Sequence, residues 1–289
     1  MTGAEDPADV AARLTGHRVL PGSVPRGASG LAEVTLDGVG TVVVKRGSDP
    51  RSARAEAAGL RWLAGADAVR LPEVRGADDD WLVVDRVETG AATPEAAEEL
   101  GRELAALHAA GVPAFGAPPP GGPADAWIGR APMANRPGDR WPRWYAEHRV
   151  LPYLREAVDR GAMGTGDAAL VERVCDRLPE LAGPDRPPAR LHGDLWNGNV
   201  LWGADGHVRL IDPAAHGGHR ETDLAMLRLF GCPHLDRVLD AYDRADPLDD
   251  GWRGRVGLHQ LFPLLVHTVL FGGGYAAQAV AAARSALRG

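Results

Sequence analysis

The chain has 289 residues, of which 45% are hydrophobic and 25% charged, and its formal net charge is −7. This composition is typical of a globular protein with one large or two modest domains, and it excludes disorder over most of the chain. The acidic excess argues against nonspecific nucleic-acid binding. The N-terminal segment has no basic stretch followed by an apolar one, and no apolar run is long enough to span a membrane, so we expect a cytoplasmic protein.

The first third of the sequence predicts a small antiparallel sheet with one main helix. Alternating apolar residues, turn residues and helical spacing indicate strands at 31–36, 41–46 and 81–84 and helices at 8–15 and 51–64. Because side chains alternate along a strand, Lys45 shares one face of the second strand with Val43. In the longer helix, Glu56 lies on the same stripe as Leu60 and Leu63.

After residue 87 the sequence becomes predominantly helical. We expect an ordered loop in the Gly- and Pro-rich stretch 112–140, an apolar hairpin over 200–211, and helices over 94–110, 141–160, 167–181 and, with breaks, 222–287. These patterns predict an α+β chain of two parts, a β-rich lobe over 1–87 and a helical lobe over 88–289. The two cysteines, Cys175 and Cys232, lack the spacing of a zinc site or a disulfide framework.

The segment 191–214 carries the residues best suited to chemistry. Asp194 and Asn199 flank a Gly-containing loop, and Asp212 follows the second strand of the hairpin, which would bring these side chains to one rim. One carboxylate and one amide oxygen suit Mg²⁺, and a second carboxylate can orient a hydroxyl and accept its proton. The spacing Asp-x4-Asn is that of protein-kinase catalytic loops, where the Asp addresses the hydroxyl and the Asn holds a metal.

The same residues are also common turn formers, because aspartate and asparagine favour turns beside glycine and proline. Their order around one hairpin, together with a single lysine upstream, favours the chemical interpretation. Lys45 is the one lysine among 32 basic side chains. Ammonium is a compact point charge and guanidinium a broad planar fork, so a position that keeps lysine against such a bias can require the compact charge. Chance retention is the alternative.

The motif HGDLWNGN, followed by DPAAHGGHRETDLAM, resembles the fructosamine kinase (ketosamine-3-kinase) family, a branch of the protein-kinase-like fold related to the aminoglycoside phosphotransferases. His-Gly-Asp followed by Asn is shared with other phosphotransferases, whereas Trp196 and the GHRE segment 218–221 are more specific to fructosamine kinases. The resemblance covers nearly the whole chain and is strongest over 191–231. It includes Phe115-Gly116, Trp127-Ile128-Gly129, Asn135 and the FGGGY segment 271–275.

The resemblance implies a bilobal fold that binds ATP between its lobes, and it implies a role for each candidate residue. Lys45 would contact the ATP phosphates, and Glu56, on an inward stripe, would be its partner. The alternative for Glu56 is a helix-terminal acid stabilised by the helix dipole. Asp194 would be the catalytic base, and Asn199 and Asp212 would bind Mg²⁺. The implied cofactors are therefore ATP and Mg²⁺.

The resemblance also implies two nucleotide contacts made by the backbone. The adenine would lie at a hinge of Asp85, Arg86 and Val87, bonded to the Asp85 carbonyl and the Val87 amide. The sequence has no G-x-G-x-x-G phosphate loop, and Gly22 and Ser23 are the expected contacts, because small residues let backbone amides approach phosphates. Ordinary turn formation is the alternative there.

Other residues of the motif have two interpretations each. His192 is expected to hydrogen-bond the backbone and fix the loop rather than bind a metal. His219 and Glu221 are expected either to brace the loop after Asp212 or to line the substrate side. The H-x2-H spacing that ends at His219 matches no helix-borne zinc motif. Trp196 is expected either to stack on a sugar-like substrate or to pack.

The expected activity is transfer of the γ-phosphate of ATP to O3 of a fructosamine or ribulosamine, free or on a protein lysine. We expect a monomer that binds neither nucleic acid nor membrane. The alternatives are a kinase for another small hydroxyl compound such as an aminoglycoside or choline, a nucleotide-binding protein without catalysis, and a metal hydrolase built on histidines and aspartates. The acceptor follows from the resemblance alone, because fold does not fix function.

Overall fold

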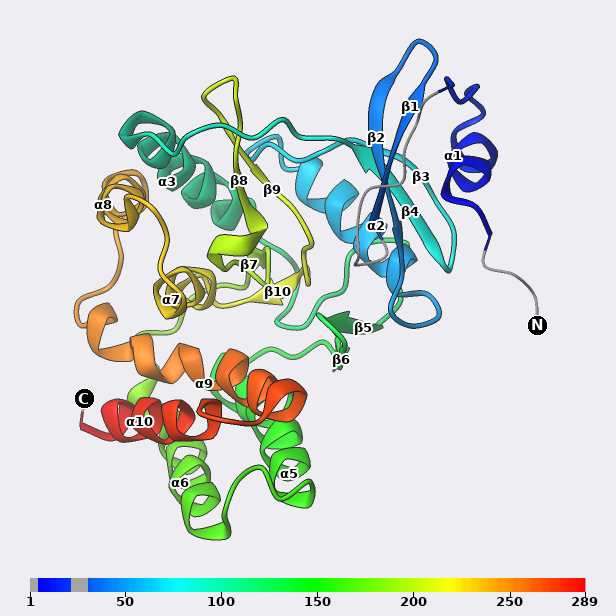
Figure 1. The fold of residues 1–289 in the computed structure, drawn as a ribbon. Helices are drawn as coiled ribbons and strands as arrows, with labels where there is room; N and C mark the ends of the chain where they lie inside the picture. The colour runs from blue at the N-terminus through cyan, green and yellow to red at the C-terminus, as the bar shows by residue number, and fades with distance from the viewer. Residues whose placement is uncertain (1–4, 22–30, 289) are drawn as a thin grey trace.

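The N-terminal part of the chain is a four-stranded antiparallel sheet with a helix on each face (Figure 1). The structure, a computed structural model, describes residues 5–21 and 31–288. The strand order is β1-β2-β4-β3. The elements are α1 (Pro7–Thr15), β1 (Leu31–Leu36), β2 (Gly40–Arg46), α2 (Ser52–Ala64), β3 (Val74–Ala77) and β4 (Trp81–Asp85).

Alternation along β2 directs its side chains to the two faces of the sheet. Val42 and Val44 are fully buried on the α1 face, in a core with Val34. Lys45 therefore points to the opposite face, where Leu82 and the buried side of α2 form a second small core. The sheet thus covers α2 with apolar side chains and directs its lysine toward the same helix.

The rest of the chain is largely helical and encloses two apolar cores. One core lies among α4, α5, α6, α9 and α10, and the other joins α3, α7 and α8 to the hairpin of β8 and β9. The elements are α3 (Pro94–Ala109), α4 (Trp141–Tyr145), α5 (Leu151–Asp159), α6 (Thr165–Leu181), β8 (Val200–Trp202), β9 (Val208–Leu210), α7 (Glu221–Leu229), α8 (Leu235–Ala245), α9 (Trp252–Phe271) and α10 (Tyr275–Arg288). In the part that the structure describes, no helix is long and apolar enough to cross a membrane.

Four local features differ from the sequence prediction, and the first is the additional strand β3 at the edge of the sheet. The stretch 112–140 is not only loop, because it contains the hairpin of β5 (Asp125–Ile128) and β6 (Ala131–Ala134). The short strands β7 (Ala189–Leu191) and β10 (His216–Gly218) pair across the chain. The predicted helix 141–160 is divided by a π-helical turn, Ala146–Val150. The turn directly precedes Leu151-Pro152, where the proline has no N–H to donate.

Candidate active site

Lys45 lies between two carboxylates from different parts of the chain. Its Nζ is 2.8 Å from Glu56 Oε2 on α2 and 2.9 Å from Asp212 Oδ1 beyond β9. Burial alone would lower the pKa of Lys45, but the two carboxylates outweigh burial and raise the pKa above its ordinary value. Burial raises the pKa of Glu56 to about 7, and the Lys45 ammonium opposes that shift. The structure therefore brings the predicted lysine and its helix partner together.

Asp194 and Asn199 belong to the loop that joins β7 to β8. The Asn199 amide nitrogen donates to the Asp194 carbonyl oxygen at 2.8 Å and lies 3.3 Å from Asp194 Oδ2. The same nitrogen is 3.5 Å from the carbonyl oxygen of Asp212. Burial raises the pKa of Asp194 to about 7, opposed by the Asn199 amide and reinforced by the Asp212 charge. A carboxyl group that titrates near neutrality is suited to accept a proton from a substrate.

A buried carboxylate that the sequence prediction overlooked holds this loop. Asp223 accepts hydrogen bonds from the backbone N–H groups of His192 and Gly193, at 2.8 and 2.9 Å, and lies 3.2 Å from His108 Nε2. Burial alone would raise the pKa of Asp223, but these hydrogen bonds outweigh burial and lower it. The His192 ring lies 2.9 Å from the Ile211 carbonyl oxygen, which supports its interpretation as a loop-fixing residue.

Two backbone positions in this region have left-handed conformations. Gly193 has φ 83°, and a Cβ there would clash with the Ala214 carbonyl oxygen, so the position requires glycine. Asp212 has φ 53°. In a non-glycine residue this conformation costs on the order of 1 kcal/mol, and such strain is commonly found at functional sites.

Helix α2 packs closely against the chain that follows Asp212. A Cβ built at Gly59 would lie 3.3 Å from Pro213 Cγ and 3.3 Å from Ala215 Cβ. The absence of a side chain at Gly59 lets the helix backbone approach this segment. The contact sets Glu56, one turn earlier on α2, beside Asp212.

These groups share one cavity of about 400 Å³ between the sheet and the helical part. Six predicted site residues line it: Lys45, Glu56, Asp194, Trp196, Asn199 and Asp212. The turn after β2, the loop 119–123 and the β5–β6 hairpin complete its walls. The cavity therefore combines an ammonium group, three carboxylates and one amide, a set suited to a charged phosphate substrate and a hydroxyl acceptor.

The three predicted substrate residues do not lie in one place in the structure. Trp196 lines the cavity and is 39% exposed. His219 and Glu221 are buried and do not line it. Both Glu221 oxygens bind the Arg255 guanidinium, at 2.9 and 2.6 Å, and the His219 ring lies 4.8 Å from the His259 ring. Glu221 and His219 therefore contact other buried side chains, Arg255 and His259, and a role in substrate binding stays a prediction.

A metal in this buried group is not supported by its hydrogen bonds. Ligand atoms of His219, Glu221 and His259 all lie within 4.8 Å of one another. However, the Glu221 carboxylate is already neutralised by Arg255, and His259 Nδ1 is 3.0 Å from the Thr222 hydroxyl. A divalent ion would have to displace the guanidinium. The donor set does not fit the metal-hydrolase alternative.

The predicted hinge begins at the last residue of β4, Asp85. The side chains of Asp85 and Arg86 are held in ion pairs with other side chains. The backbone N–H of Arg86 donates to the Thr41 carbonyl at 3.1 Å, whereas the Val87 N–H has no acceptor among the described residues. This free amide is compatible with the adenine contact, which stays a prediction. The expected phosphate contacts Gly22 and Ser23 lie outside the described residues.

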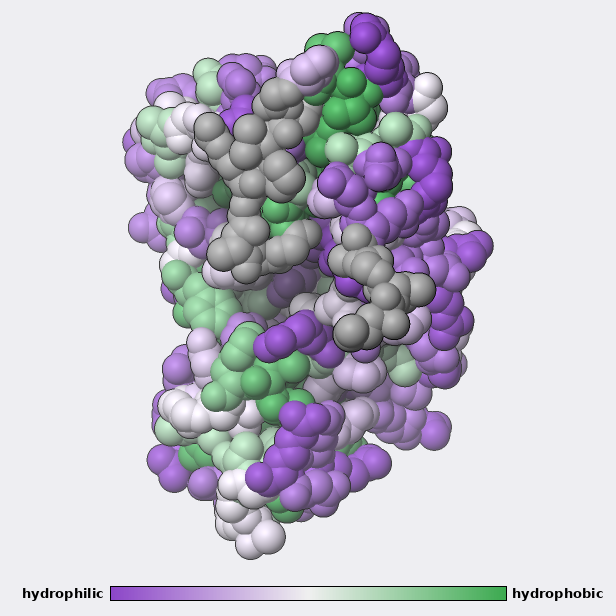
Figure 2. Space-filling model, turned by 45° about the vertical axis from the view of Figure 1, so that its right-hand side comes forward, coloured by the Kyte–Doolittle hydropathy of each residue, from purple (hydrophilic) through white to green (hydrophobic). Residues whose placement is uncertain are grey.

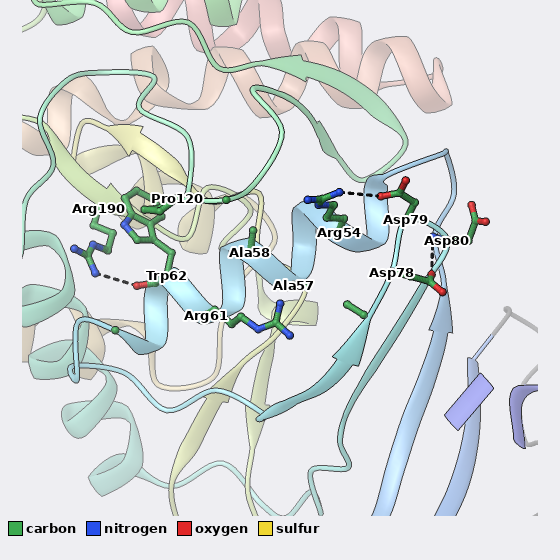
Figure 3. A pocket seen from close by; sticks show the side chains of 13 residues that line it. Arg54, Ala57, Ala58, Arg61, Trp62, Asp78, Asp79, Asp80, Pro120 and Arg190 are labelled. Atoms are coloured by element: carbon green, nitrogen blue, oxygen red, sulfur yellow. Dashed lines mark hydrogen bonds and ion pairs between the residues drawn. The ribbon is translucent and has the colours of Figure 1, made fainter. Parts of the chain in front are cut away.

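A larger cavity of about 1090 Å³ lies on the outer side of α2 and contains none of these groups (Figure 3). Arg54 approaches Asp79 at 3.5 Å on one side, and Arg190 donates to the Trp62 carbonyl at 2.9 Å on the other. Its charged side chains are spread along α2 and the turn 78–80, as Figure 3 shows. The smaller cavity is the candidate active site because the chemistry-bearing residues converge there.

The fold is kinase-like. The structure of macrolide 2′-phosphotransferase type I shares this fold, with a TM-score of 0.60 at 19% identity over 95% of this chain and 94% of that one. The shared features are an N-terminal antiparallel sheet with its helix and a largely helical C-terminal part.

Sequence similarity then identifies the family. The fructosamine kinase family model matches residues 39–288, and the chain belongs to this family. It is 37% identical to the probable ketoamine kinase TTHA1179 of Thermus thermophilus, over 82% of this chain and 84% of that protein. It is 30% identical to the chloroplastic protein-ribulosamine 3-kinase of Arabidopsis thaliana, over 90% of this chain and 80% of that protein.

A crystal structure from Thermobifida fusca, provisionally assigned as a fructosamine-3-kinase, superposes with a TM-score of 0.92 at 50% identity. The match covers 99% of this chain and all of that one. The protein is therefore a fructosamine-3-kinase-like phosphotransferase, an enzyme class that uses ATP.

Proposed function

We propose that the enzyme transfers the γ-phosphate of ATP to O3 of a ketoamine, a fructosamine or ribulosamine that is free or attached to a protein lysine. The observation that carries this proposal is the convergence of Lys45, Asp194, Asn199 and Asp212 on one cavity. Family membership supports the ketoamine acceptor. The proposed organisation is a nucleotide-binding lobe over 1–87 and a catalytic lobe over 88–289.

On the nucleotide side, Lys45 would bind phosphate oxygens through its point charge, and Glu56 would hold the ammonium in position. The Glu56–Lys45 distance of 2.8 Å already provides that support. The adenine would bond the backbone of the segment 85–87, which includes the free Val87 amide. Asp212 Oδ1 now accepts a hydrogen bond from the Lys45 ammonium group. Once phosphate oxygens take its place beside the ammonium group, this carboxylate oxygen would become available as a metal ligand.

The donor atoms near the phosphates fit Mg²⁺. The Asn199 nitrogen is used inside the protein, so its amide oxygen is left without a partner among the described residues. The Asp212 side chain is 46% exposed to the cavity side. An amide oxygen beside a carboxylate is a donor pair that Mg²⁺ accepts. Bound there, the ion would neutralise charge on the phosphates.

Asp194 would orient the acceptor and accept its proton. The O3 oxygen attacks the γ-phosphorus and forms the new P–O bond, while the bond from the γ-phosphorus to the β,γ-bridging oxygen breaks and ADP leaves. The O3 proton passes to the Asp194 carboxylate. Because the loop is fixed through Asp223, the carboxylate is in place before the acceptor binds. Most of the rate enhancement is expected from positioning and charge stabilisation.

A panel of acceptors tests the proposal. Purified enzyme is given labelled ATP and Mg²⁺ with a ribulosamine, a fructosamine, an aminoglycoside or choline, and phosphate transfer is measured for each. We expect transfer to the ketoamines, at O3, and none above background with Asp194→Asn. Preferential phosphorylation of choline or the aminoglycoside would replace the ketoamine assignment with the alternative kinase.

A further inference from the structure

A continuous set of aromatic rings leads from the catalytic cavity to the protein surface. Trp196 lines the cavity, and its ring meets Phe230 edge-on at 5.9 Å. The ring centroids of Phe230 and His267 are 5.0 Å apart. The His267 centroid is in turn 5.5 Å from that of Phe271 and 5.0 Å from that of Tyr275. We call these five residues the aromatic shelf. It joins the catalytic loop to the end of α9 and the start of α10.

The aromatic shelf includes large apolar side chains that are exposed to solvent. Only Leu31, Trp196 and Phe271 are exposed large hydrophobic side chains in the described ranges, and two of the three belong to the shelf. Phe271 is 58% exposed. On the face shown in Figure 2, hydrophobic surface gathers beside the hollow in the middle of the molecule. Exposed aromatic surface continuous with a cavity indicates a ligand contact rather than core packing.

A cation lies on the wall of the same cavity. Arg130, in the turn of the β5–β6 hairpin, lines the cavity and has no hydrogen bond or ion pair with any described residue. A Cβ built at Gly129 would be 3.9 Å from Leu270 Cδ1, so this turn adjoins the end of α9 that carries Phe271. Arg130 and the aromatic shelf therefore border the same region of the cleft.

The hairpin that carries Arg130 is firmly anchored. The buried Arg149 guanidinium donates to the Ala134 carbonyl oxygen at 2.9 Å and to Asn135 Oδ1 at 2.6 Å. The Tyr153 hydroxyl donates to the Pro132 carbonyl oxygen at 2.6 Å. These bonds fix β6 against the helical part, so the backbone from which Arg130 projects is held in place before a ligand binds.

We propose that Arg130 and the aromatic shelf recognise the amine half of the acceptor, and that the preferred acceptors are ketoamines of free α-amino acids with apolar or aromatic side chains. This inference rests on the proposed function. In such a ketoamine the amine nitrogen is on C1, close to the O3 that Asp194 addresses, so the amino-acid part must lie at the wall of the same cavity. Its α-carboxylate matches the unpaired guanidinium, and its side chain matches the rings.

The test separates the two contacts with matched acceptors. Ketoamines are prepared on phenylalanine, phenylalaninamide, glycine and glycinamide, and kcat and KM are measured for the wild type, Arg130→Gln and Phe271→Ala. Arg143→Gln is the control, since Arg143, on α4, is an exposed arginine paired with Glu147. We expect the wild type to favour the acids over the amides about 10-fold in kcat/KM. We expect it to favour the phenylalanine ketoamines over the glycine ketoamines about 5-fold in kcat/KM.

Each variant should remove one preference and leave the other. Arg130→Gln should abolish the preference for the carboxylate, and Phe271→Ala the preference for the ring, through KM with kcat unchanged, because neither contact reaches the reacting atoms. Phe271→Tyr should restore the ring preference. Equal kcat/KM for all four ketoamines in the wild type would overturn the inference and leave the proposed function intact.

Two further outcomes are informative. A uniform fall in kcat for every acceptor in Arg130→Gln would place Arg130 on the transferred phosphate and would also overturn the inference. Failure of the wild type to phosphorylate any of these ketoamines, with transfer to choline or an aminoglycoside, would instead overturn the proposed function itself.

Discussion

Lys45 and Asp194 face the same cavity, but the structure holds them in different ways. Among the described residues, the Lys45 ammonium group is bound only by side-chain carboxylates, one from α2 and one from beyond β9, and the Asp212 side chain is 46% exposed. Asp194 lies in a loop whose backbone amides bind the buried carboxylate of Asp223. His108 and Tyr242 extend that buried network, with the His108 ring 2.8 Å from the Tyr242 hydroxyl.

This difference separates the parts of the site that can rearrange from those that cannot. Ion pairs at a partly exposed position are exchanged at low cost, so Lys45 can release Asp212 when phosphates arrive. Backbone hydrogen bonds to a buried carboxylate are costly to break. In the proposed function, the nucleotide side would therefore be adjustable and the acceptor side preorganised. Substitutions on the two sides should consequently affect different measurements.

The largest expected effect comes from removing the reacting carboxylate while keeping the hydrogen bonds that hold its loop. Asp194→Asn should reduce kcat by roughly 10³-fold, within the usual range for loss of a general base. Affinity for ATP should change little because the nucleotide groups are untouched. Single-turnover phosphate transfer and equilibrium nucleotide binding measure the two quantities. Full turnover in this variant would contradict the role assigned to Asp194.

Removing the Asp223 carboxylate that holds this loop should reduce folding stability as well as turnover. Asp223→Ala leaves two buried backbone amides without an acceptor and should lower the free energy of unfolding by about 3 kcal/mol. Urea denaturation measures this loss. Asp240→Ala, at an exposed position on α8, is the control and should change stability by less than about 0.5 kcal/mol. A loss no larger than that of the control would show that the loop does not depend on Asp223.

A substitution of Lys45 is expected to have a smaller effect, and that effect should be confined to the kinetics with ATP. Lys45→Arg keeps the charge but replaces a point charge with a planar fork between Glu56 and Asp212. We expect kcat/KM for ATP to fall about 10-fold, with the unfolding free energy changed by less than about 1 kcal/mol. Steady-state kinetics with varied ATP, together with urea denaturation, would test this. Unchanged ATP kinetics would show that the compact charge is not required.

The smallest expected effect is a dependence of stability on pH set by buried histidines. Burial lowers the pKa of His216 and of His219 to about 3, below the ordinary value near 6.5. Between these values the unfolded chain binds more protons, so stability falls as pH decreases. Each histidine should cost about 1 kcal/mol at pH 5.5 relative to pH 7. His219→Asn should show a smaller decrease in urea midpoint over this interval, and a decrease equal to that of the wild type would refute the assignment.

The elements with regular periodicity could be predicted from the sequence. The strands around Lys45, the helix that carries Glu56 and the hairpin after Asn199 all lie close to their expected positions. The β5–β6 hairpin was missed because its strands are only four residues long and its stretch is rich in glycine and proline. The strands β7 and β10 are three residues long and pair across the chain, so no local pattern indicates them.

The candidate site could be predicted where chemistry constrains residue type, and less well where packing decides. Lys45, Glu56, Asp194, Asn199 and Asp212 share one cavity, as the motif spacing indicated for the last three and the family resemblance for the first two. The role of Asp223 was not predicted because its partners are backbone amides about 30 positions earlier, which carry no residue-type signal. The burial of Glu221 depends on Arg255 on α9, a contact that appears only in three dimensions.

The close approach of α2 to the Pro213–Ala215 segment has a consequence for the alignment of the two lobes. Even one methyl group at Gly59 would press on Pro213 and Ala215 and push the helix outward. A displacement of a few tenths of an ångström there would be passed to Glu56, one turn earlier on α2, and would change its 2.8 Å contact with Lys45. Steric fit at one helical glycine therefore contributes, together with electrostatic attraction, to the spacing across which the ammonium group reaches.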